Sequence, residues 1–498
     1  MMNDTARDNN SYGHVLKYTG IFGGVQGLNI LISLVRNKLV AVILGPAGMG
    51  LASLFNTAAN FLAQATSLGI SFSAIRNLSE IIDSGDNERI SRLVKTVRAW
   101  SLVASLLGVL VCLAASPLLS RYMFDGESHA LELMMLAPVV AMTTFTGGET
   151  ALLKGARRLR GLAYVQVMMV FASLVTSVPI YLLFGVRGII PVLQLAALAN
   201  LLLTLRCSCR LFPLRLGGGM SLLGEGMGMV RLGMAFVVSG IFGSGAEMVV
   251  RSFLNNAADL GTVGLYNAGY MITVTYAGMV FSAMETDYFP RLSAVNHDTA
   301  AVNLAANRQI EVSLLVIAPM LAFLITALPV LIPLLFSGRF APVAGMAQVS
   351  VLGMYARAMM LPVAYITLAK GHSSAFVVLE GLSAVGLIVA IVACFSRWGL
   401  WGAGLAVTLS NVFDLLTILV YARVRYRFRL SRQVLASVAV LLPTGIVAYA
   451  ATMIGSTWLG VAVGMAATVA CTALSLRTLS RKTHIVSKLR EWFTRRRR

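Results

Sequence analysis

The chain alternates between long apolar runs and short polar segments. Residues 99–119 and 434–451 are mostly apolar runs of about twenty residues, and neither contains a charged side chain. A helix needs roughly 20 such residues to cross a bilayer, whereas the strands of a membrane barrel alternate apolar and polar positions over about ten. Because a backbone in lipid must satisfy its own hydrogen bonds, this pattern predicts an all-α polytopic membrane protein.

We predict about fourteen transmembrane helices joined by short connections. They cover residues 16–44, 47–75, 97–119, 131–153, 161–184, 187–206, 230–255, 262–286, 309–336, 343–369, 374–396, 400–422, 434–453 and 456–476. Glycine marks several of the expected turns, at Gly45-Pro46, Gly185, Gly338 and Gly399. Every predicted connection is too short to hold a soluble domain.

Composition supports a chain embedded in lipid. Of its 498 residues, 57% are hydrophobic and only 12% are charged, whereas soluble domains carry about 25% charged residues. The net charge of +20 would suggest nucleic acid as the partner of a soluble protein. Here the basic residues are dispersed among short loops and form no nucleic-acid motif, which argues against that partner.

The basic residues instead predict the orientation of the chain. If the N-terminus lies inside, thirty-two of the 40 Lys and Arg residues fall in inside segments, four in outside loops and four within spans. Bacterial membrane proteins keep Lys and Arg on the cytoplasmic side. We therefore expect a multi-pass protein of the bacterial inner membrane with both termini in the cytoplasm.

A weak internal repeat predicts the domain organisation. With an offset of 214 residues, Gly50-Leu51 aligns with Gly264-Leu265, and with an offset of 216, Lys154-Gly155 aligns with Lys370-Gly371. Six spans separate equivalent points, so the two halves would run the same way through the membrane. We predict four parts in chain order: an N-terminal six-helix bundle (1–215), a C-terminal six-helix bundle (216–430), two appended transmembrane helices (431–480) and a basic amphipathic cytoplasmic tail (481–498).

Sequence patterns typical of enzymes are absent from the chain. It has no glycine-rich phosphate-binding loop ending in Lys-Ser/Thr, and its five histidines are scattered without metal-ligand spacing. A membrane polymerase or glycosyltransferase would need a sizeable outside loop with catalytic side chains. We therefore expect no catalytic residues, no metal, no cofactor and no enzyme activity.

Charged residues inside the spans are the candidate functional residues. A charge at the centre of a bilayer costs about 2.5–3.5 kcal/mol on insertion scales, so it needs a partner, a cavity or a function. Arg357 lies near the middle of its span, too deep for its side chain to reach either interface. We expect it to face a cavity and contact substrate, with a structural ion pair as the alternative.

Further basic side chains lie in two other spans. Arg36 and Lys38 are in the first span; Arg36 is marginal for reaching the interface and Lys38 could reach it, and both are candidates for substrate contact. Glu247 and Arg251 are four residues apart, a spacing that suits an ion pair on one helix face. The alternative is that Arg251 contacts an anionic substrate or that Glu247 titrates during transport.

Three further acids lie within spans. Glu380 and Asp414 are deep enough for either to carry a coupling proton, as Glu247 could. Glu149 lies near the predicted inner end of its span, and we expect it at the membrane interface.

The sequence around the first turn resembles a known family. The segment Arg36-Asn37-Lys38-Leu39-Val40-Ala41-Val42-Ile43-Leu44-Gly45-Pro46-Ala47-Gly48-Met49-Gly50-Leu51 is similar to the start of polysaccharide flippases, including Wzx-type O-antigen translocases. These proteins belong to the multidrug/oligosaccharidyl-lipid/polysaccharide (MOP) exporter superfamily. The resemblance implies two bundles around a central cavity that opens alternately to each side. Two spans beyond twelve are a departure from the simplest Wzx pattern and are similar to MurJ-like lipid II flippases.

The residues and the resemblance favour a flippase for an undecaprenyl-diphosphate-linked oligosaccharide, such as an O-antigen repeat unit. A cavity lined by arginines would bind the phosphates. The expected partners are this lipid-linked oligosaccharide, membrane lipids and other polysaccharide assembly proteins. The alternatives are a drug or cation antiporter of the same superfamily, a membrane enzyme of glycan assembly, and a channel or structural membrane protein.

Overall fold

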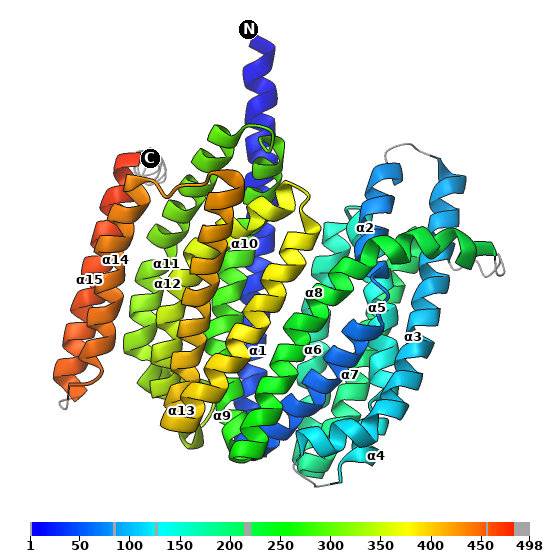
Figure 1. Cartoon of the computed structure of the whole chain (residues 1–498). Coiled ribbons are helices and arrows are strands. Elements are labelled where there is room, and N and C mark those ends of the chain that lie inside the picture. The colour runs from blue at the N-terminus through cyan, green and yellow to red at the C-terminus, as the bar shows by residue number, and fades with distance from the viewer. Residues whose placement is uncertain (1, 83–85, 125–127, 214–220, 455–456, 483–498) are drawn as a thin grey trace, which may run out of the picture. The chain divides into compact units, whose positions relative to one another are not determined.

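The computed structural model describes residues 2–82, 86–124, 128–213, 221–454 and 457–482, and these residues form helices without strands (Figure 1). Ten of the described helical segments are long and apolar enough to cross a membrane. The predicted fold class, an all-α polytopic membrane protein, is confirmed. The number of fourteen spans stays a prediction.

The chain divides into two compact units. The first is Met1–Gly264 with Leu335–Ser337, and the second is Leu265–Leu334 with Gly338–Arg498. The two six-helix bundles that meet at residue 215, and the two helices appended after them, were predicted from the sequence repeat and stay predictions. The predicted basic tail lies mostly outside the described residues, which end at residue 482.

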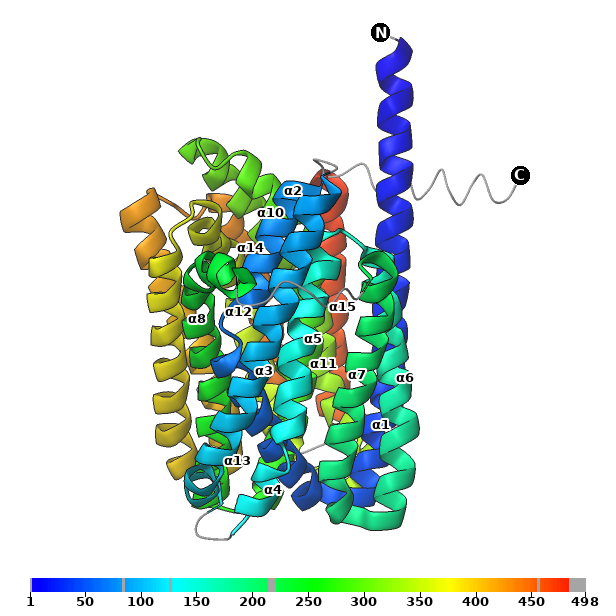
Figure 2. The ribbon, with the colours of Figure 1, turned by 90° about the vertical axis from the view of Figure 1, so that its right-hand side faces the viewer.

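The first unit is built from the N-terminal helices. They are α1 (Met2–Thr66), α2 (Ile70–Ile81), α3 (Asn87–Met123), α4 (Ala130–Met134), α5 (Ala137–Gly155), α6 (Leu159–Phe184), a 3₁₀ turn (Gly185–Gly188), α7 (Ile189–Leu211), α8 (Ser221–Ala257) and the start of α9 (Leu260–Tyr270). Helix α5 packs between α3 and α7, and α8 packs against α1 and α3 (Figure 2). This packing brings side chains from α3, α5 and α7 together.

The turn between the first two predicted spans lies inside α1. Gly45 has φ +66° and ψ −174°, a conformation that costs little only for glycine. Pro46 follows, and its fixed φ suits the first turn of a helix. Gly50 then approaches α9 so closely that a Cβ atom there would lie 1.9 Å from the Leu260 carbonyl oxygen. The glycines of this motif therefore allow both the turn and the contact with α9.

The second unit contains the remaining helices. They are a π-helical segment (Met271–Tyr276), α10 (Ala277–Ala294), α11 (Thr299–Leu335), a 3₁₀ turn (Gly338–Phe340), α12 (Val343–Ala369), α13 (Ser373–Tyr426), α14 (Arg432–Ala451) and α15 (Thr457–Lys482). Helix α13 reverses at Gly399, where φ is +55°, and both of its arms hold a predicted span. Helices α12 and α13 pack along much of their length, and α14 pairs with α15 (Figure 1).

Large apolar side chains cover much of the outer surface. Leu183 on α6 and Val424 on α13 are 77% and 80% exposed. Soluble monomers rarely expose large continuous apolar patches. The multi-pass membrane protein expected from the sequence is therefore confirmed, and lipid is the solvent of these side chains.

Candidate functional site

Arg36 and Lys38 lie on different faces of α1. The Arg36 side chain is half-buried, and its Nε donates a hydrogen bond of 3.3 Å to Ser177 Oγ on α6. Two residues along a helix correspond to a rotation of about 200°, so Lys38 points nearly the opposite way. The two cations therefore cannot contact one phosphate from the same side of α1.

Arg251 forms the ion pair that its spacing from Glu247 predicts. Its Nη1 is 3.2 Å from Glu247 Oε2, and its Nε donates a hydrogen bond of 2.9 Å to Ser53 Oγ on α1. Arg251 is only 4% exposed, whereas the Glu247 side chain is 40% exposed. The pair therefore links α8 to α1 and leaves the carboxylate accessible from one side.

Arg357 lies in the middle of α12. At 1.5 Å per residue it is about 21 Å from Val343 and about 18 Å from Ala369, the two ends of the helix. Its side chain is half-buried, and its buried Nε makes no hydrogen bond within the described part of the chain. No carboxylate of the described residues lies within the 4.0 Å of an ion pair with it. The structural pair considered as its alternative role is thus not seen among them.

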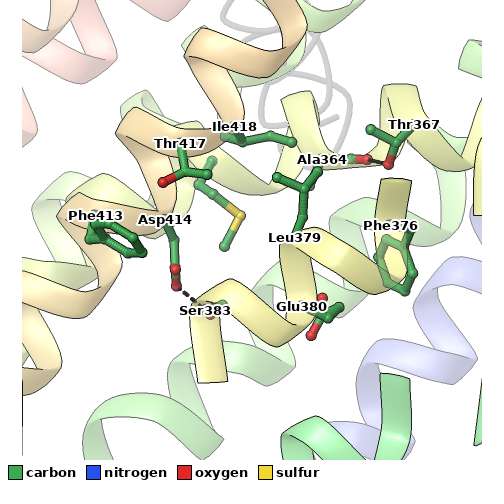
Figure 3. A pocket seen from close by; sticks show the side chains of 11 residues that line it. Ala364, Thr367, Phe376, Leu379, Glu380, Ser383, Phe413, Asp414, Thr417 and Ile418 are labelled. Atoms are coloured by element: carbon green, nitrogen blue, oxygen red, sulfur yellow. Dashed lines mark hydrogen bonds between the residues drawn. The ribbon is translucent and has the colours of Figure 1, made fainter. Parts of the chain in front are cut away.

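Two carboxylates lie near Arg357 in the second unit. Glu380 and Asp414, one on each arm of α13, line a cavity of about 60 Å³ together with residues of α12 (Figure 3). Ser383 Oγ donates a hydrogen bond of 2.9 Å to Asp414 Oδ2. Arg357 lies within electrostatic range of both carboxylates. The cavity has room for a few water-sized occupants.

The structure therefore divides the predicted residues into two groups. Glu247 and Arg251 pair in the first unit, where Arg36 and Lys38 also lie, and Arg357 joins Glu380 and Asp414 in the second. That all these cations line one shared cleft stays a prediction.

A buried ionic network was missed by the sequence analysis. Glu149 on α5 is 1% exposed, so its carboxylate is buried against other helices, and its expected depth at the membrane interface stays a prediction. Arg98 Nε on α3 is 2.7 Å from Glu149 Oε1, and Ser208 Oγ on α7 donates to the same carboxylate. Arg98 Nη2 also donates a hydrogen bond of 3.0 Å to the Phe212 carbonyl oxygen. Arg98 and Glu149 are 51 positions apart in the sequence, so only the packing of α3 on α5 brings them together.

Solved structures of transporters share this fold. The lipid II flippase MurJ in an inward closed conformation is 15% identical, with a TM-score of 0.71 over 92% of this chain and 99% of that chain. An inward-facing multidrug-resistance MATE family transporter of the MOP superfamily is 16% identical, with a TM-score of 0.68 over 80% and 94%. A MOP superfamily transporter from Pyrococcus furiosus, described as having a binding pocket of reversed polarity, is 15% identical, with a TM-score of 0.59 over 80% and 93%. These similarities confirm the MOP-type fold that the resemblance implied.

Sequence comparison identifies the family. No curated protein matches the chain. A family model described as "Polysaccharide biosynthesis protein" matches residues 39–345, which is more than half of the chain and includes the Gly45-Pro46 turn and the Glu247–Arg251 pair. The chain therefore belongs to the polysaccharide biosynthesis protein family and has the fold of the MOP exporter superfamily.

Proposed function

We propose that this protein is a flippase that moves an undecaprenyl-diphosphate-linked oligosaccharide from the cytoplasmic to the periplasmic leaflet by alternating access. An O-antigen or related repeat unit is the proposed cargo, and the bacterial inner membrane, with both termini cytoplasmic, is the proposed location. The family and the MOP-type fold support a flippase or a related transporter. The arginine in the middle of α12 supports an anionic lipid-linked cargo.

The proposal rests on the position of Arg357 in the middle of a membrane span. A guanidinium in the middle of a membrane span is costly, and its donors fit phosphate oxygens in a bidentate way. The Nε of Arg357 retains a donor for another partner. A diphosphate bound there would form charge-assisted hydrogen bonds, which are about twice as strong as neutral ones.

The membrane potential can contribute to the direction of transport. An inside-negative potential favours the export of an anion by about 2.3 kcal/mol per charge per 100 mV. Arg36, Lys38 and Arg251 are the proposed substrate contacts of the first unit. Glu380 and Asp414 would bind a coupling cation in the second.

The Glu380–Asp414 cavity also supports a second candidate, a MATE-like cation or drug antiporter. Two carboxylates on the wall of one cavity would attract a cation more readily than an anion once both are ionised. The two functions differ in what Arg357 does. In a flippase it binds the phosphates, whereas in a cation antiporter it would only balance the acids.

Transport in reconstituted vesicles tests the proposal. The Arg357→Ala variant should insert and fold but lose at least tenfold in the initial rate of flipping of an undecaprenyl-diphosphate-linked oligosaccharide, because the cation in the middle of α12 is gone. The matched control is Arg339→Ala, which removes an exposed guanidinium of the same unit outside α12 and should keep the wild-type rate. Wild-type flipping by Arg357→Ala, or cation-driven drug efflux without glycan flipping by the wild type, would overturn the proposal.

A further inference from the structure

A cavity of about 280 Å³ with both polar and apolar lining residues lies in the first unit between α2, α5 and α7. Its polar lining consists of Ser71, Thr143, Thr146, Thr150, Lys154 and Asn200. None of these residues was singled out as a candidate from the sequence. The volume is near the lower end of the roughly 300–1,000 Å³ of small-molecule sites, so it suits one sugar ring or one phosphate group more than a whole oligosaccharide.

Most of the polar groups form a row on α5. Thr143, Thr146, Thr150 and Lys154 follow one another at spacings of three and four residues, which places them on one face of the helix. Lys154 is in the last turn of α5, so the row extends about 16 Å from that end into the span. A face turned toward acyl chains would be apolar, whereas this face offers hydroxyls throughout its length.

The hydroxyls keep hydrogen-bonding capacity for another partner. Thr146 Oγ1 donates to the Met142 carbonyl oxygen at 2.7 Å, and its oxygen can still accept a hydrogen bond. Gly147 lies next to Ser71. A Cβ atom on Gly147 would lie 2.9 Å from Ser71 Oγ, so the absence of a side chain there leaves space for the Ser71 hydroxyl at the cavity surface. Lys154 is exposed and makes no ion pair within the described ranges.

The predicted sequence repeat offers a comparison for these hydroxyls. With the offset of 216 that aligns Lys154 with Lys370, the three threonines correspond to apolar residues of α12. These are Met359, Pro362 and Ile366. Lys370 itself donates to the Asn296 carbonyl oxygen. At this offset the corresponding positions of α12 are apolar and the lysine is engaged, so the hydroxyl row is a feature of α5 and not of both halves of the predicted repeat.

We propose that this cavity is an entry subsite for the head group of the lipid-linked glycan, with the sugar nearest the lipid against the hydroxyls and the diphosphate at Lys154, at an earlier step of transport than the contact of the diphosphate with Arg357. This inference rests on the proposed flippase function and names a subsite for its cargo. Serine and threonine hydroxyls and the Asn200 amide both donate to and accept from sugar hydroxyls. A lysine ammonium binds phosphate as a point charge. The row on α5 then guides the polar head group into the span.

Matched ligands separate the two parts of the subsite. The probes are undecaprenyl diphosphate bearing one hexosamine, undecaprenyl diphosphate alone, free hexosamine and phosphatidylglycerol, each titrated against the purified full-length protein. The double variant Thr146→Val/Thr150→Val should lose about tenfold in affinity for the sugar-bearing lipid, as expected for two lost hydrogen bonds, and change little toward the sugar-free lipid. Lys154→Gln should weaken the binding of both diphosphates.

The control is Thr176→Val on α6, which removes a half-buried hydroxyl of the same unit that bonds the Ala172 carbonyl oxygen at 2.8 Å. It should bind every probe as the wild type does. Unchanged preference for the sugar-bearing lipid in the α5 double variant would overturn the subsite, as would equal binding of phosphatidylglycerol or of free hexosamine by the wild type. The transport assay distinguishes a wrong subsite from a wrong function. If only the subsite is wrong, the wild type still flips the glycan and Arg357→Ala still loses flipping. If the flippase function is wrong, the wild type does not flip the glycan.

Discussion

Two arginines on α3 show how burial changes the cost of breaking an ion pair. Arg98 pairs with Glu149 at side-chain exposures of 11% and 1%, whereas Arg92 pairs with Glu225 at 65% and 41%. Breaking a buried pair leaves one charge without a partner in a low-dielectric site. An exposed pair loses little because water replaces the partner.

We therefore predict that Arg98→Ala destabilises the protein by about 3–5 kcal/mol, while Arg92→Ala leaves its stability nearly unchanged. The measurement is the midpoint of thermal unfolding in detergent, followed by the fluorescence of a thiol-reactive dye at the buried cysteines. Glu149→Gln, which keeps the shape of the side chain, should lie between the two arginine variants. Equal midpoints for the two arginine variants would refute the structural role assigned to the network.

The same comparison shows which residues of the site the sequence could predict. The Glu247–Arg251 pair is local, four residues apart on one helix, so spacing alone predicted it. The Arg98–Glu149 pair depends on α3 meeting α5, and no local pattern encodes that meeting. The polar row on α5 had a visible signal in its spacing of three and four residues, but single hydroxyls in a span are common and did not stand out.

At the level of elements, local glycine signals predicted turns well. Gly45, Gly185 and Gly399 all have positive φ, as expected for turns marked by glycine, and Gly338 begins a short 3₁₀ turn. The break between α1 and α2 was missed, because the second span was predicted to run through it. Gly69 has φ +66° there, and it lies directly against Gly233 of α8. That contact is distant in sequence, so the local pattern could not show it.

The contact between α1 and α9 gives a prediction about packing. A Cβ atom on Gly264 would lie 1.9 Å from the Pro46 carbonyl oxygen, which is backbone and cannot move aside. Gly264→Ala should therefore lower the yield of folded protein and the unfolding midpoint, measured by size-exclusion chromatography and thermal unfolding in detergent. Gly243→Ala on α8, where a Cβ would meet open space, is the control and should be neutral or slightly stabilising, because alanine favours helix by about 0.5–1 kcal/mol over glycine. Normal stability of Gly264→Ala would mean that α1 and α9 do not meet in this way.

At the scale of the whole molecule, the two halves of the predicted sequence repeat differ in the polar side chains of their spans. The span that holds the hydroxyl row in the first unit corresponds to the span that holds Arg357 in the second. The hydropathy pattern predicted the common architecture, because both repeats must meet the same bilayer. It could not predict the specialisation of each unit, which depends on a few polar side chains in otherwise apolar helices.

That specialisation leads to a prediction about energy coupling. When both are ionised, Glu380 and Asp414, with Arg357 in electrostatic range, carry a net charge of −1 together with it, and one bound proton or sodium ion would neutralise that charge. A cavity lined by both carboxylates gives such an ion a place to bind. If this ion drives the return of the empty transporter, neutral variants should uncouple transport from the ion gradient without removing the binding of the cargo.

We expect Glu380→Gln and Asp414→Asn to abolish the stimulation of glycan flipping by an imposed proton or sodium gradient, while the affinity for the lipid-linked glycan stays within about twofold of wild type. The measurement is flipping in vesicles with each gradient imposed separately at zero membrane potential, with Glu80→Gln as the control because that carboxylate is exposed and outside the cavity. Asp414→Asn keeps an acceptor for the Ser383 hydroxyl, so lost stimulation in this variant reports the charge rather than a broken contact. Gradient stimulation that persists in both variants would place the coupling ion elsewhere and leave the membrane potential, acting on the anionic cargo, as the driving force.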